Sequence, residues 1–107
     1  MENQFGQNFE RILSKKEILE VLGRYVDNFV FVREQSDEKG ICLLEVKVTN
    51  PETGEIAEYQ YMRKGKLTSI HVAYYNAGNE IPISGDMVAE FNSETGKWKD
   101  AKGYVKK

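Results

Sequence analysis

Two turn-forming segments of nearly the same sequence constrain the fold of this chain most strongly. Residues 50–54 read NPETG and residues 92–96 read NSETG, and each lies between runs rich in β-branched and aromatic side chains. An asparagine side chain hydrogen-bonds readily to the backbone of a turn, and glycine tolerates a positive φ, so both segments predict a reversal of the chain. We therefore expect an antiparallel sheet with short hairpin connections.

Alternation of apolar and polar residues predicts a meander of about five strands, followed by a short return strand. The expected strands cover 29–34, 41–49, 55–63, 67–76 and 87–92, and the return strand covers 97–99. A loop at 51–54 would place Val46 opposite Tyr59, and a two-residue turn at 64–65 would place Tyr59 opposite Ile70. One face then carries the expected core residues: Phe29, Phe31, Leu44, Val46, Val48, Tyr59, Tyr61, Ile70, Val72 and Tyr74.

A helix is expected to begin at Ser14. Ser14 and Glu17 have the spacing of a capping box, in which each side chain accepts a hydrogen bond from the backbone N–H of the other. Apolar residues then recur at helical spacing and predict a stripe that packs on the sheet: Ile18, Leu19, Leu22, Tyr25, Val26 and Phe29. Phe5 and Phe9 have a similar spacing upstream, so a second, shorter helix is an option.

These patterns predict an α+β fold in which one N-terminal helix, or two, packs on a curved antiparallel meander. The 107 residues suit a single compact domain over 1–107, with a flexible, lysine-rich tail from about residue 101. A net charge of −2 disfavours nucleic acid and anionic membranes as partners. Residues 1–8 lack the basic and apolar features of a signal or membrane span, so we expect a cytoplasmic protein.

No metal or cofactor is expected. The chain has one histidine and one cysteine, which is too few for a zinc-binding set, and it has no loop with the alternating oxygen ligands that calcium requires. The cysteine, Cys42, lies in an apolar run and is expected to pack as a small hydrophobic residue.

The other face of the predicted sheet has an apolar end, which makes it a candidate interface. Its residues are Val30, Val32, Ile41, Leu43, Met62 and Leu67. A surface this apolar is expected to be covered. The cover would be the segment around Phe5 and Phe9, the chain after Gly85, or a second copy related by a two-fold axis.

Further along this face, the expected register aligns Lys47, Glu58 and His71 in one row. A carboxylate opposite a histidine can orient the imidazole for acid–base chemistry, and a neighbouring lysine can bind an anion. Opposite charges across antiparallel strands also stabilise an exposed face without any chemistry, and we favour that interpretation.

Four tyrosines are candidates for the walls of a ligand pocket between helix and sheet: Tyr25, Tyr59, Tyr61 and Tyr74. Tyrosine suits such a site because the ring packs while the hydroxyl orients a ligand. Close packing of the same rings in a core is the ordinary alternative.

The sequence favours a small non-enzymatic domain that binds another protein, as an adaptor, or binds a second copy of itself. The reasons are the apolar end of the outer face and the lack of a recognisable catalytic set. The alternative is a small-molecule-binding domain, or a modest acid–base enzyme, with a tyrosine-lined cleft.

Overall fold

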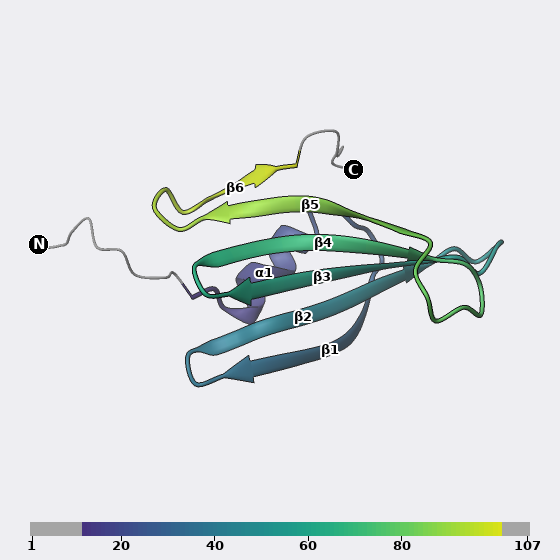
Figure 1. Cartoon of the computed structure of the whole chain (residues 1–107), viewed down its shortest axis with the longest axis horizontal. Coiled ribbons are helices and arrows are strands. Elements are labelled where there is room, and N and C mark those ends of the chain that lie inside the picture. The colour runs from purple at the N-terminus through teal and green to yellow at the C-terminus, as the bar shows by residue number, and fades with distance from the viewer. Residues whose placement is uncertain (1–11, 102–107) are drawn as a thin grey trace, which may run out of the picture.

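The computed structural model describes residues 12–101, which form one short helix and a six-stranded antiparallel sheet. Each strand pairs with the next, so the sheet is a meander, and the helix packs on one face, here called the inner face (Figure 1). The elements are α1 (Lys15–Leu22), β1 (Val30–Asp37), β2 (Gly40–Thr49), β3 (Ile56–Lys64), β4 (Leu67–Tyr75), β5 (Ser84–Asn92) and β6 (Lys97–Asp100).

The fold is mostly β, which agrees only roughly with the predicted α+β class. The return strand expected at 97–99 is a sixth strand of the sheet, and the helix is small. The second helix predicted around Phe5 and Phe9, and the tail beyond residue 101, lie outside the described residues.

The predicted capping box is present at the start of α1. The Glu17 N–H donates to Ser14 Oγ at 3.2 Å, and the Ser14 N–H donates to Glu17 Oε1 at 3.1 Å. The helix ends at Leu22 and is capped by Gly23, so it is shorter than the predicted stripe. Residues of low helix propensity follow Leu22: Gly23, Tyr25, Val26, Asp27, Asn28 and Phe29. Asn28 then takes a positive φ of 54° before β1 begins.

Tyr25 and Val26 remain in the core although they lie beyond the helix. Their exposed fractions are 5% and 7%. The Tyr25 hydroxyl donates a hydrogen bond to Asp100 Oδ1, which links this segment to β6. Burial, together with the Asp100 carboxylate, raises the pKa of Tyr25 to about 12. The apolar spacing therefore predicted burial correctly and helix length wrongly.

Both predicted turn segments form the same hydrogen-bonded loop. Asn50 Oδ1 accepts from the N–H groups of Glu52 and Thr53 at 2.9 and 3.3 Å. The second turn repeats these bonds: Asn92 Oδ1 accepts from Glu94 and Thr95 at 2.8 and 3.2 Å. The closing glycines, Gly54 and Gly96, have φ values of 78° and 72°. The two turns lie at opposite ends of the sheet (Figure 1).

The predicted register is correct between β2 and β3 and wrong between β3 and β4. Val46 lies opposite Tyr59, as expected, but Tyr59 lies opposite Val72 instead of Ile70. The turn uses Gly65 and Lys66, with Lys64 opposite Leu67. Gly65 takes a φ of 61° at the first central position, as a type II′ turn requires, and this moves the turn one residue along the chain. The register changes by two residues, so each side chain keeps its face.

The core lies between α1 and the inner face of the sheet. Six of the ten predicted core residues are buried, and Phe29, Val48 and Tyr74 pack at its edge. Phe31 is the exception, with 45% of its surface exposed, because it belongs to the edge strand β1. Its ring instead lies 4.6 Å from Lys15 Nζ. The largest fully buried side chains are Tyr61, Ile18, Leu22, Leu44, Ile70, Val46 and Val88.

Candidate functional site

The short helix covers one end of the inner face only in part. At 1.5 Å per residue, its eight residues span roughly 12 Å, whereas strands of nine or ten residues extend roughly 30 Å. The paired residues Tyr59 and Val72 are 8% and 2% exposed. Two positions further along the strands, Val48, Ala57 and Tyr74 are only partly buried. We call the hollow at this end of the sheet the end groove.

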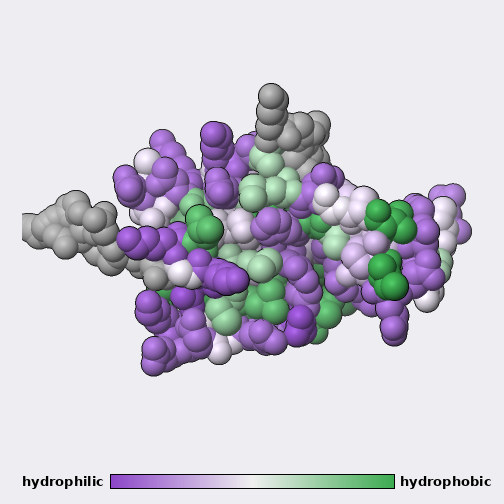
Figure 2. All heavy atoms as spheres, viewed as in Figure 1, coloured by the Kyte–Doolittle hydropathy of each residue, from purple (hydrophilic) through white to green (hydrophobic). Residues whose placement is uncertain are grey.

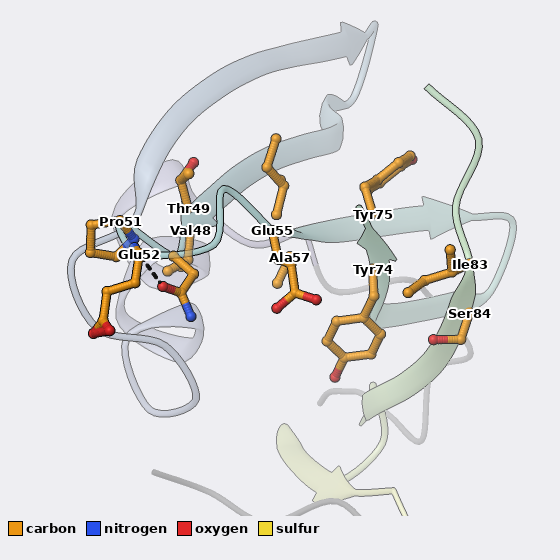
Figure 3. Close-up of a pocket in the computed structure, with 12 residues that line it drawn as sticks. Val48, Thr49, Pro51, Glu52, Glu55, Ala57, Tyr74, Tyr75, Ile83 and Ser84 are labelled. Carbon is orange, nitrogen blue, oxygen red and sulfur yellow. Dashed lines mark hydrogen bonds between the residues drawn. The ribbon is translucent and has the colours of Figure 1, made fainter. Parts of the chain in front are cut away.

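The end groove has a volume of about 690 Å³ and is open to solvent. Figure 3 shows the residues that line it. Val48 pairs with Ala57, Ala57 with Tyr74, and Tyr74 with Ser84, so a single row of the sheet crosses four strands beneath it. Ala57, the smallest residue on this floor, lies between Val48 and Tyr74 and leaves space between them. Thr49 and Tyr75 also line the groove, and their side chains leave the sheet on the other side (Figure 3).

The two loops beside the groove lie close together. A Cβ placed on Gly54, in the β2–β3 turn, would lie 2.9 Å from Ala77 Cβ in the β4–β5 loop. The Ile83 N–H donates to the Tyr74 carbonyl at 2.8 Å and fixes the return of that loop to β5. The groove is therefore bounded by two loops that pack closely at Gly54 and Ala77.

Carboxylates give the end groove a negative character. Glu52 and Glu55 are the charged residues of its lining, and their carboxylates lie on the same side of the sheet as the Tyr74 ring (Figure 3). Burial raises the pKa of Tyr74, and Tyr59 and the Asp86 carboxylate raise it further. Burial, with a smaller effect of Glu58, raises the pKa of Tyr75, whose hydroxyl donates to Glu58 Oε1 at 3.4 Å.

An apolar rim adjoins the groove. Ile83, which lines it, is 58% exposed, and Ile81 in the same loop is 79% exposed. Strongly hydrophobic surface is visible at the end of the molecule that carries the β4–β5 loop (Figure 2). Exposed β-branched residues beside an apolar hollow are typical of a surface that contacts another molecule.

Only one of the four tyrosines predicted to line a pocket contributes to the groove. Tyr25, Tyr59 and Tyr61 are 5%, 8% and 0% exposed and belong to the core. Tyr74 lines the groove, together with Tyr75, which sequence reasoning missed as a lining residue. The prediction assumed a longer helix with a pocket beneath it; the groove lies where that helix is lacking.

The candidate acid–base row does not form as predicted. His71 lies opposite Gln60, whereas Glu58 lies opposite Ala73 and Lys47. The cause is the two-residue change of register at the Gly65 turn. His71 Nε2 instead lies 2.9 Å from the hydroxyl of Ser69, two residues away on the same strand.

The row that contains His71 also includes a buried carboxylate. Glu45 is 4% exposed and accepts hydrogen bonds from Arg33 Nε and Gln60 Nε2. These contacts satisfy both of its oxygens and link β1, β2 and β3 on the outer face. The arrangement is a structural network in which the carboxylate already has a cationic partner.

The residues of the predicted interface are divided between two environments. Val30, Val32 and Leu67 are 58%, 39% and 66% exposed, and Leu43 and Met62 form a half-buried cross-strand pair. Ile41 packs instead against the core, because the β1–β2 register is irregular next to it, between Gln35 and Ser36. Apolar side chains alternate with polar ones on this outer face (Figure 2).

Within residues 12–101, no group of three or more His, Cys, Asp or Glu side chains is arranged to hold a metal ion. None of the helices in this part of the chain has the length and apolar character needed to cross a membrane. No protein-family model, curated protein or solved structure matches this chain. The functional argument therefore depends on the geometry of the site.

Proposed function

We propose that this protein is a non-enzymatic interaction domain that binds an apolar segment of another protein in the end groove. The observation that supports the proposal most is the partly exposed row of Val48, Ala57 and Tyr74, which continues the core face beyond the end of the helix. Apolar surface of this kind gains stability when a partner covers it, at about 25 cal/mol per Å² removed from water.

An extended peptide fits this surface better than an enclosed small molecule. Neighbouring strands lie about 4.8 Å apart, so the four-strand row is roughly 14 Å long, the length of about four extended residues. Small-molecule sites usually enclose most of the ligand, whereas the end groove is open to solvent. The exposed Ile81 and Ile83 extend the apolar contact beyond the groove.

Filling the groove tests this proposal. A blocked, uncharged peptide with the sequence Gln-Leu-Tyr-Leu-Gln serves as the probe, and its affinity is measured by isothermal titration calorimetry. We expect Ala57→Phe to weaken binding at least tenfold, because the larger ring occupies the space between Val48 and Tyr74. The matched control is Ala73→Phe, the same change on the outer face of the neighbouring strand, which leaves binding unchanged.

Circular dichroism checks that both variants are folded. If neither substitution then changes the affinity for the peptide, the end groove is excluded as its binding site. The acid–base alternative makes a different prediction, since it requires the outer face. If His71→Ala removes a ligand response that Ala57→Phe preserves, the functional site is the outer face and the interaction proposal is wrong.

A further inference from the structure

The charges around the end groove identify the kind of segment that it selects, provided that the groove is the binding site proposed above. We infer that the end groove binds a peptide segment in which lysine or arginine alternates with apolar side chains. The apolar side chains would contact the floor, and the cationic side chains would lie at the β2–β3 turn.

The charged part of the lining is entirely acidic. Glu52 and Glu55 supply its charges, and none of the described residues that line the groove is a lysine, arginine or histidine. Within residues 12–101, neither carboxylate forms an ion pair. The Glu55 carboxylate only accepts a hydrogen bond from the Thr53 hydroxyl, at 3.2 Å. Asp86, on the strand that ends the four-strand row, adds negative potential near Tyr74.

Three carboxylates on β1 and β2 are paired within the chain. Lys15 Nζ lies 2.8 Å from Glu34 Oε1, and Arg63 Nη2 lies 2.7 Å from Asp37 Oδ1. Glu45 is paired with Arg33. At the groove, the chain supplies the acidic half of such pairs, and a ligand would supply the other half. Complementary charge of this kind favours a cationic partner and disfavours an anionic one.

The aromatic floor is compatible with the same ligand. The faces of tyrosine rings attract lysine and arginine side chains, whose aliphatic stems also pack on apolar surface. Tyr74 therefore suits a segment whose cationic residues are flanked by apolar ones. An acidic segment would have its carboxylates beside Glu52, Glu55 and Asp86, and repulsion would weaken its binding.

Three blocked peptides test the inference: Lys-Leu-Tyr-Leu-Lys, Gln-Leu-Tyr-Leu-Gln and Glu-Leu-Tyr-Leu-Glu. We expect affinity to fall in that order. Because exposed charge pairs contribute up to about 1 kcal/mol each, the basic peptide should bind about five- to thirtyfold more tightly than the neutral one. Its advantage should decrease as salt shortens the Debye length from about 30 Å at 0.01 M to about 3 Å at 1 M.

A charge-matched pair of variants assigns the effect to the groove. Glu52→Gln with Glu55→Gln should remove most of the preference for the basic peptide. Glu90→Gln with Glu94→Gln changes the net charge by the same amount at the far end of the sheet and should preserve the preference. Glu94 is a close control because it occupies the same place in the second turn as Glu52 does in the first.

The outcomes separate this inference from the proposed function. If the neutral peptide binds, loses affinity with Ala57→Phe, and is bound as tightly as the basic peptide, the end groove is a binding site without the inferred charge preference. If both double variants reduce the preference equally, it arises from net charge alone and the inference is wrong. If Ala57→Phe leaves the affinity of every peptide unchanged, the proposed function itself fails.

Discussion

At the scale of single residues, Tyr61 has the most costly environment in the core. The residue is completely buried, and its hydroxyl has no hydrogen-bond partner among the described residues. Burial raises the pKa of this phenol, and the positive charge of Arg63 opposes that effect. An unsatisfied buried hydroxyl destabilises a protein by about 1–3 kcal/mol, whereas the ring itself stabilises the core.

Removal of this hydroxyl should therefore stabilise the protein. We expect Tyr61→Phe to increase the free energy of unfolding by about 1 kcal/mol, since the ring and its packing are preserved. Urea denaturation followed by circular dichroism measures the change. A clear loss of stability would indicate that the hydroxyl has a partner, for example a buried water molecule.

A second prediction at this scale concerns acid stability. The hydrogen bond from Arg63, and then that from the Lys39 N–H, hold the pKa of Asp37 below its usual value. A depressed folded-state pKa stabilises the fold above the unfolded-state pKa, which is about 3.9 for aspartate, and this stabilisation is lost as the pH falls through the folded-state value. Asp37→Asn should therefore lower the free energy of unfolding at pH 7. It should also make that free energy fall less steeply as the pH decreases.

Urea titrations between about pH 2 and pH 7 measure this effect. In Asp37→Asn, Arg63 keeps acceptors in the carbonyl oxygens of Ile41 and Gly40, at 3.3 and 3.4 Å, so the variant should remain folded. Identical pH profiles for the variant and the natural protein would contradict the account.

At the scale of elements, the two glycine turns beside β3 differ in what surrounds them. Gly54 and Gly65 both have positive φ values, of 78° and 61°. A Cβ on Gly65 would meet nothing within 4 Å, whereas a Cβ on Gly54 would collide with Ala77. The Gly65 turn therefore needs glycine for backbone conformation alone, whereas the Gly54 turn also needs it for the contact between the two loops.

Alanine substitutions should separate these two requirements. Gly65→Ala is expected to destabilise the protein by about 1–2 kcal/mol, the cost of a left-handed conformation. Gly54→Ala should cost more and should also weaken peptide binding, because it displaces a wall of the end groove. Thermal unfolding and calorimetry measure both effects; equal costs, with binding unchanged, would show that the Gly54–Ala77 contact does not shape the site.

How well each element could be predicted from the sequence depends on how local its determinants are. The capping box at Ser14 and the turns at Asn50 and Asn92 are specified within four or five residues, and all three are present. The length of α1 and the register at Gly65 depend on competition between local and tertiary preferences, and both predictions were wrong. The end groove was missed because it exists only where the helix stops.

At the scale of the whole molecule, self-association through the outer face stays a prediction. Leu43 and Met62 pair across β2 and β3, with the exposed Leu67 at the same end of the sheet. We expect a concentration-dependent dimer that is lost when Leu43 and Met62 are both changed to glutamine, since half-buried apolar area then becomes polar. Sedimentation velocity measures the mass, and circular dichroism checks the fold. A monomer at every concentration would contradict this prediction.

The most direct test of the central claim is a map of intermolecular NMR contacts. Isotope-labelled protein is mixed with the unlabelled neutral peptide, and nuclear Overhauser effects between the two are recorded. The account predicts cross-peaks from the peptide leucine methyl groups to the Ala57 methyl group and the Tyr74 ring. Cross-peaks to Leu43, Met62 or Leu67 alone would place the ligand on the outer face and contradict the claim that the end groove is the binding site.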